Sequence, residues 1–208
     1  MHLEFLKDLD EYFCENYTNY DKLCLQPDYK MPVMNATKRL KDGRIYAYTL
    51  PSTTMRLSLQ EKKAEVLASL KEGLFDAEFS FSFKPLSFWG WIKDSFQKYS
   101  FKKVFPILLA RKGLTVEDAK KAVVLDEKVW RRILKGRYYP TKALIYRIGL
   151  CCALSEKDVN DLLCLCGYSY DFNSVRDVVI SYLFHNGITN AELVNCAFAE
   201  YKITSMKM

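Results

Sequence analysis

A row of basic side chains near position 130 is the part of this sequence best suited to binding chemistry. Its central members are Lys128, Arg131, Arg132 and Lys135. Spacings of three and four residues put side chains on one side of a helix, so these four share a face if the segment is helical. Lysine and arginine pair with phosphate groups, and arginine also bonds the edge of guanine. The pattern therefore predicts a helix that contacts nucleic acid.

The charge of the chain is concentrated around this row. Residues 98–142 contain 13 basic and 4 acidic residues, a net charge of +9, whereas the whole chain carries +6. Residues 1–97 carry −1 and residues 143–208 carry −2. A focused positive field is what the neutralisation of phosphates requires, because each contacted phosphate releases a counterion. A well-solvated, lysine-rich surface is the alternative explanation of the charge alone.

Two helices in succession must position the basic row. Thr115 and Asp118 form a capping-box pattern for the first, and Asp126 is placed to cap the second, which we expect over 127–135. The connection between them is short and contains Val124 and Leu125. Two helices joined in this way are typical of the helix-turn-helix.

The second helix has a clear inner side. Trp130 and Ile133 are one turn apart and are expected to pack inward with Leu125. Glu127 and the four cations then remain outside.

Further helices surround this pair. Apolar periodicity, capping residues and terminating glycines predict seven helices between Phe101 and Phe198. The fifth is expected to start at a capping box of Ser155 with Asp158, and the seventh at one of Thr189 with Glu192. The C-terminal half is therefore predicted to be all-helical, with further helices beyond the helix-turn-helix pair.

Several separated motifs recur in order in this half. They are Leu125 to Ile133, Tyr139 to Lys142, Asp161 to Leu163, Cys166 to Tyr168, Val178 to Leu183 and His185 to Gly187. Together they resemble a bacterial branch of the Cro/XRE-like helix-turn-helix fold, the lambda-repressor-like fold. The resemblance covers about residues 100–201, and in that branch the domain usually lies at the C-terminus of uncharacterised proteins, sometimes behind a macro domain. No macro-domain sequence precedes the helices here.

The resemblance implies that the helix over 127–135 enters the major groove while the preceding helix lies across the DNA backbone. Together with the charge pattern, it gives a set of candidate DNA-binding residues. They are Thr115, Lys120, Glu127, Lys128, Arg131, Arg132, Lys135, Arg137 and Lys142.

The N-terminal half is predicted to mix helices and short strands. We expect a helix over 3–17, a strand over 44–50, a helix that starts at a Ser58–Glu61 capping box and ends at Gly73, and a strand over 75–84 with five alternating apolar residues. An aromatic helix or linker follows over 87–100. The expected class is α+β overall, with a mixed α/β region over 1–97 and an all-α helix-turn-helix domain over 98–208.

Other classes of function find little support in the sequence. The seven cysteines lack the spacing of a zinc site, so no metal or cofactor is expected. A glycine-rich phosphate loop and a nucleophile elbow are missing, which argues against an enzyme. The sequence has neither an apolar run long enough to span a bilayer nor an export-signal pattern, so we expect a cytoplasmic protein without a membrane partner.

Two hypotheses of function remain. The first is a transcriptional regulator that binds double-stranded DNA, with a homodimer formed through the N-terminal half because one short helix reads few base pairs. The second is a protein-interaction adaptor, in which a helix-turn-helix-like domain that does not bind DNA docks an acidic partner. The extra C-terminal helices and the phenylalanine-rich strand motivate this alternative.

Overall fold

The computed structural model describes residues 2–17, 35–39, 45–49, 63–74, 87 and 99–204. Within these ranges the protein is predominantly helical, with nine α-helices and two strands of five residues each. The expected α+β class is therefore wrong, and the protein is predominantly all-α. The physical reason is that the buried apolar side chains of the described ranges lie on helices or directly beside them, and none of the described strand side chains is buried.

Three predictions for the N-terminal half lie outside the described residues. They are the Ser58–Glu61 capping box, the strand over 75–84 and most of the aromatic segment over 87–100. Two helices of this half are described, α1 (His2–Asn16) and α4 (Lys63–Gly73), and both agree with the helices predicted there.

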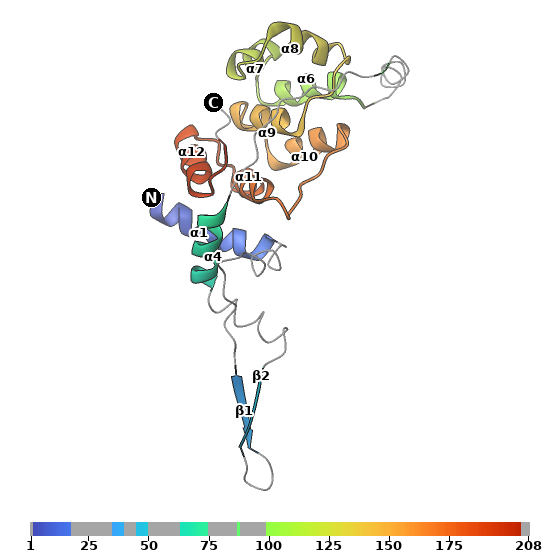
Figure 1. Ribbon diagram of the computed structural model, residues 1–208. Helices are drawn as coiled ribbons and strands as arrows, with labels where there is room; N and C mark the ends of the chain where they lie inside the picture. The colour runs from blue at the N-terminus through green and yellow to red at the C-terminus, as the bar shows by residue number, and fades with distance from the viewer. Residues whose placement is uncertain are drawn as a thin grey trace.

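Seven helices follow one another in the C-terminal half, as the apolar periodicity predicts. Together α6 to α10 form one bundle, in which α10 packs against α6 and α9, α7 packs on α9, and α6 contacts α7 and α8. In Figure 1, α6, α7 and α8 lie at the end of the molecule farthest from the two strands. The helices are α6 (Phe101–Arg111), α7 (Val116–Ala122), α8 (Glu127–Leu134), α9 (Lys142–Cys151), α10 (Glu156–Leu165), α11 (Val175–His185) and α12 (Ala191–Glu200).

The starts of these helices depend on side-chain caps. The capping box of Ser155 with Asp158 forms at the start of α10, as predicted. At α12 the prediction of Thr189 is wrong, because the side chain of Asn190 accepts the hydrogen bonds of the first turn instead. Asparagine is as good a cap as threonine, and both residues stand before the same apolar run, so the pattern alone selected the wrong neighbour.

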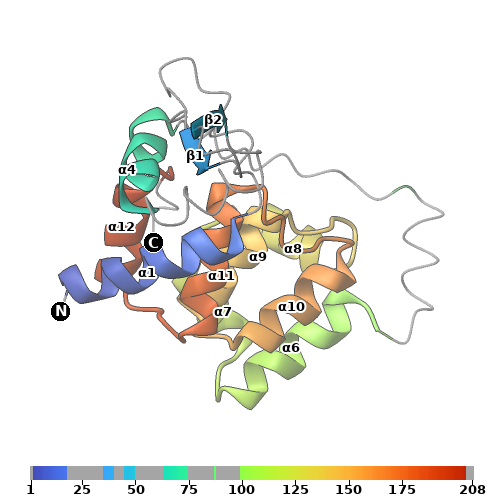
Figure 2. The same ribbon diagram turned by 90° about the horizontal axis from the view of Figure 1, so that it is seen from below.

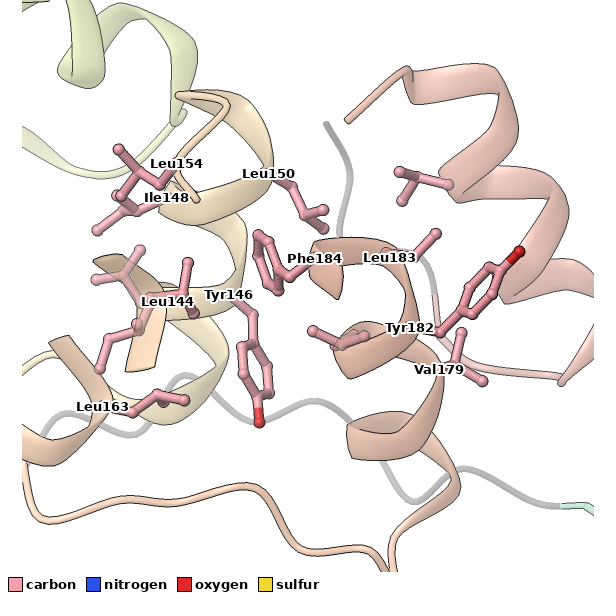
Figure 3. Packing of buried hydrophobic residues seen from close by; sticks show 14 of the residues in the cluster. Leu144, Tyr146, Ile148, Leu150, Leu154, Leu163, Val179, Tyr182, Leu183 and Phe184 are labelled. Carbon is pink, nitrogen blue, oxygen red and sulfur yellow. The ribbon is translucent and has the colours of Figure 1, made fainter. Parts of the chain in front are cut away.

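Helix α11 is the central helix of the core. Every residue from Asp177 to Phe184 is buried, because three helices, α1, α10 and α12, pack against α11. Figure 3 shows the contact with α9, where Phe184 of α11 lies close to Tyr146 and Leu150. A helix covered on all sides leaves little of its surface for a partner.

The N-terminal helix α1 is part of this core. The side chains of Leu9 and Phe13, and of Tyr17 directly after the helix, are buried, on the side that the sequence periodicity predicts. The Tyr12 hydroxyl lies 3.0 Å from the Ser181 hydroxyl of α11. Helix α1 also contacts α12 and α4, and Figure 2 shows it running across α11. Residues far apart in the sequence thus share one core, while the predicted domain boundary at residue 97 stays a prediction.

A polar cluster joins α1, α4 and the end of α12. The Asp10 carboxylate accepts hydrogen bonds from Lys71 Nζ and from the Tyr201 hydroxyl, both at 2.7 Å. Lys71 also pairs with Glu200 at 2.6 Å and lies 4.7 Å from the centre of the Tyr201 ring. Burial and the bond to Asp10 raise the pKa of Tyr201, so its hydroxyl keeps its proton and remains a donor.

The two strands form a separate hairpin. Strand β2 (Ile45–Thr49) matches the strand predicted over 44–50, and it pairs antiparallel with β1 (Asn35–Arg39). Strand β1 was missed because its sequence, with a single β-branched residue and two cations, lacks the alternation that signals a strand. The hairpin projects away from the helices (Figure 1).

Close packing at Gly149 gives a test of the core. A β-carbon at this position of α9 would lie 2.7 Å from Val159 Cγ2 and 2.7 Å from Phe184 Cζ, and both neighbours are buried. Overpacking of this kind costs about 1–3 kcal/mol, whereas alanine gains about 1 kcal/mol over glycine in a helix. We expect Gly149→Ala to lower the free energy of unfolding by the difference of these two effects, up to about 2 kcal/mol, in a urea titration.

The matched control is Gly73→Ala at the exposed end of α4, which should leave the stability unchanged or raise it slightly. An equal effect of the two substitutions would contradict the proposed close approach of α9 to its neighbours.

Candidate nucleic-acid interface

Helices α7 and α8 meet across a four-residue connection, residues 123–126. Asp126 caps the N-terminus of α8, because its carboxylate oxygen Oδ1 accepts the backbone N–H of Lys128 at 2.8 Å and that of Val129 at 3.2 Å. These bonds satisfy two of the donors that a helix start leaves unpaired. The predicted pair of short helices and the predicted cap are both present.

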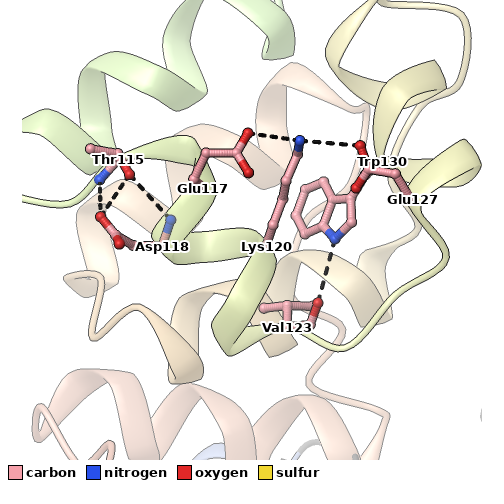
Figure 4. Close-up of polar contacts among 7 residues, drawn as sticks. All are labelled: Thr115, Glu117, Asp118, Lys120, Val123, Glu127 and Trp130. Atoms are coloured by element: carbon pink, nitrogen blue, oxygen red, sulfur yellow. Dashed lines mark hydrogen bonds and ion pairs between the residues drawn. The ribbon is translucent and has the colours of Figure 1, made fainter.

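The start of α7 is fixed by a reciprocal cap (Figure 4). The Thr115 hydroxyl accepts the backbone N–H of Asp118 at 3.2 Å and donates to the Asp118 carboxylate at 2.7 Å. The carboxylate also accepts the backbone N–H of Thr115 at 2.8 Å. These bonds to the charged form lower the pKa of Asp118. Thr115, a predicted site residue, therefore has a structural role at the N-terminus of α7.

The inner side of α8 is anchored by two buried side chains. Trp130 and Ile133 are each only 1% exposed. The Trp130 ring stacks on Phe105 of α6 with a centroid distance of 6.3 Å, and its Nε1–H donates to the carbonyl oxygen of Val123 at 3.4 Å. Burial of an indole ring together with a bond from its N–H fixes the rotation of α8 about its own axis. Helix α8 consequently has one defined outer face.

Lys120 links α7 to α8 by two ion pairs. Its Nζ lies 2.9 Å from Glu117 and 3.3 Å from Glu127, the first residue of α8 (Figure 4). The bond to Glu117, followed by that to Glu127, raises the pKa of Lys120. Both carboxylates are exposed, so these bonds orient the side chains more than they stabilise the fold. Lys120 and Glu127 were predicted to contact DNA, and the structure brings them together as a bridge at the edge of the α8 face.

The outer face of α8 and its C-terminal extension is basic and exposed. Five predicted site residues lie there, and in the described part of the chain neither Lys128 nor Arg131 forms an ion pair. No described acidic side chain therefore neutralises these two. The five are Lys128, Arg131, Arg132, Lys135 and Arg137.

Arg132 has an aromatic neighbour that the sequence did not reveal. Its Nη1 donates to the Tyr138 hydroxyl, and its guanidinium lies 5.1 Å from the centre of the Tyr138 ring. A guanidinium stacked on a ring loses less conformational freedom when it binds an anion. The turn that follows α8 contains Gly136, which has a φ of 69°, and it brings the chain back to Arg132. Because this turn places Tyr138 beside Arg132, the contact can be identified from the structure but not from the sequence.

Lys142 differs from the other predicted site residues. At the first position of α9, its Nζ pairs with Asp177 of α11, whose side chain is only 5% exposed. The same Asp177 oxygen accepts the backbone N–H of Asp171 at 2.7 Å. Removing Lys142 would leave a buried carboxylate without its charge partner, which is costly. Lys142 thus links α9 to α11 through an ion pair and is not part of the α8 face.

The six described cysteines lie on or beside the helices, with Cys152 buried and Cys164 exposed. Burial, with a smaller effect of Cys151, raises the pKa of the Cys152 thiol to about 11, so it is protonated at neutral pH. Among the residues that the structure describes, no group of three His, Cys, Asp or Glu side chains could hold a metal ion.

Comparisons with family models, with curated proteins and with solved structures find no match for this chain. Among the described residues, no helix combines the length and the hydropathy that crossing a membrane requires. The Cro/XRE-like resemblance therefore stays a prediction made from the sequence.

The cap of α8 can be tested separately from the charge of the cap residue. Loss of an N-cap costs about 0.5–2 kcal/mol, so we expect Asp126→Ala to lower the free energy of unfolding by about 1 kcal/mol in a urea titration. Asp126→Asn removes the same charge but keeps a capping oxygen, and it should retain nearly the full stability. Equal losses in the two variants would show that the charge of Asp126, rather than its cap, stabilises α8.

Proposed function

We propose that this chain is a DNA-binding protein, a transcriptional regulator of the Cro/XRE-like helix-turn-helix type, in which α8 enters the major groove of duplex DNA. The observation that supports the proposal is the exposed cationic face of α8, held outward by the buried Trp130 and Ile133. A helix of this length fits the major groove, and α7 would then lie across the backbone.

The roles of the side chains follow from their surroundings. Arg131 and Lys128 have no ion pair to break within the described residues, so they are the first choices for contacts to base edges and phosphates. Arg132, pre-oriented by Tyr138, is suited to a phosphate or to guanine. Glu127, held by Lys120 at 3.3 Å, would lie where a carboxylate can accept from the amino group of cytosine.

The proposal includes a cytoplasmic location in a bacterial cell, where the DNA is, and it assigns no catalytic role. It also includes a homodimer, because one short recognition helix contacts too few base pairs for useful discrimination. Two copies bound one helical turn apart would double the number of base pairs that are read.

The double substitution Lys128→Ala with Arg131→Ala tests this proposal most simply. Each phosphate contact contributes about 0.9 to the slope of log K against log salt concentration. If both side chains contact phosphates, the slope should fall in magnitude by about 2 for each chain bound. A contact to guanine would instead appear as a loss of sequence preference, worth about 1–3 kcal/mol. Binding is measured by fluorescence anisotropy of labelled duplexes at several salt concentrations.

The control is Lys7→Ala with Lys157→Ala, which removes two exposed cations from α1 and α10. This control should bind DNA as the unmodified chain does. If the Lys128→Ala, Arg131→Ala variant keeps both the salt slope and the sequence preference, the claim that α8 contacts DNA is overturned.

A further inference from the structure

Among the described residues, each strand of the β1–β2 hairpin has one edge without a partner strand. Its sheet contains two strands, and within the described ranges each strand pairs only with the other. Four side chains of the hairpin are described, and all are exposed: Thr37, Lys38, Ile45 and Ala47. Ile45 is 72% exposed. An isolated two-stranded hairpin is marginally stable in water, and more strands or packing against a helix are needed for stability. The hairpin is therefore suited to pairing with another strand.

The two edges differ in charge. Strand β1 carries Lys38 and Arg39, whereas β2, with the sequence Ile-Tyr-Ala-Tyr-Thr, has no charged residue. Lysine and other charges on an edge strand oppose pairing with a further strand. Aromatic and β-branched residues favour strand formation. The edge of β2 is thus open to pairing, and the edge of β1 is protected.

We propose that β2 pairs with β2 of a second copy of this chain, antiparallel and about a two-fold axis. Full overlap of the five residues places Ala47 opposite Ala47 of the second copy, and Ile45 opposite Thr49. In this register Tyr46 stands opposite Tyr48 of the second copy. The four strands form one sheet whose outer strands are the two copies of β1.

This arrangement closes on itself. A two-fold contact uses the same surface on both copies and leaves no free β2 edge, so it ends at a dimer. The cations of β1 lie on the outer edges of the four-stranded sheet, where they oppose the addition of further strands. An open-ended stack of hairpins is therefore disfavoured.

The proposed contact leaves α8 accessible. In Figure 1 the hairpin and α8 lie at opposite ends of the molecule, with α11, α1 and α4 between them. Helix α11, which a dimer could otherwise use, is already covered by α1 in the same chain. The use of this dimer to present two α8 helices to DNA rests on the proposed function, but the β2 contact itself does not require DNA.

The test compares two lysine substitutions on the same face of the hairpin. Ala47 and Thr37 are cross-strand partners, and both are exposed. Ala47→Lys places like charges opposite each other at the two-fold axis, whereas Thr37→Lys adds the same charge to the outer strand. Sedimentation velocity of the full chain without DNA, over a range of concentrations, measures the dissociation constant of the dimer.

We expect a dimer of the unmodified chain, dimerisation that is roughly fivefold weaker or worse for Ala47→Lys, and little change for Thr37→Lys. An equal mixture of Ala47→Lys with Ala47→Glu should restore the dimer, since opposite charges then meet at the axis. Circular dichroism of the helices should be unchanged in all variants, because the hairpin lies outside the helical core.

Several results would overturn the proposal. These are a monomer at every concentration, an equal loss of dimer in the two lysine variants, no rescue in the mixture, or a hairpin that is protected from hydrogen exchange only when DNA is added. The DNA-binding titration distinguishes this failure from that of the proposed function. A monomer that binds DNA through α8 removes the β2 contact and the homodimer but leaves the proposed DNA binding in place. A β2 dimer that ignores DNA removes only the proposed DNA binding.

Discussion

The burial of Trp130 is the interaction on which the candidate site depends. A helix as short as α8 is not stable by itself, so its position comes from packing rather than from helix propensity. Because Trp130 stacks on Phe105 and donates to the carbonyl of Val123, α8 is fixed both to α6 and to the turn that precedes it. This anchor fixes which side of α8 faces the core. Ile133, one turn from Trp130, is therefore buried, and Arg131 lies on the exposed side. The cationic face is a consequence of this anchor, and among the described residues Glu127 at its edge is paired with Lys120 rather than with a cation of the face.

Local rules in the sequence predicted the parts of this arrangement that depend on neighbouring residues. The caps at Thr115 and Asp126, the inward Trp130 and the outward Arg131 all follow from spacings of four residues or fewer. At such distances the helix itself sets which side chains meet, so the pattern carries enough information. The error at α12 shows the limit of that information, since two adjacent residues could both serve as a cap.

Contacts between distant segments could not be predicted from the sequence. Lys142 matched the pattern of a DNA contact, yet its partner Asp177 is 35 positions away and on another helix. The position of α1 on α11, with Tyr12 beside Ser181, depends on how the whole chain folds. The class of the fold was overturned for a related reason: a strand pattern shows that a segment is extended, but not whether that segment contributes to the core. The predicted partner, a second copy bound through the N-terminal half, stays a prediction, and the β2 contact proposed above is one way to form it.

The most direct measurement of the central claim is the change in backbone amide resonances of the full chain when duplex DNA is added. The proposed function predicts that the largest changes fall within residues 115–137, and that amides of α11 and α12 change little. Large changes confined to other helices, or none at DNA concentrations that saturate an anisotropy titration, would contradict the claim that α8 is the surface that binds DNA.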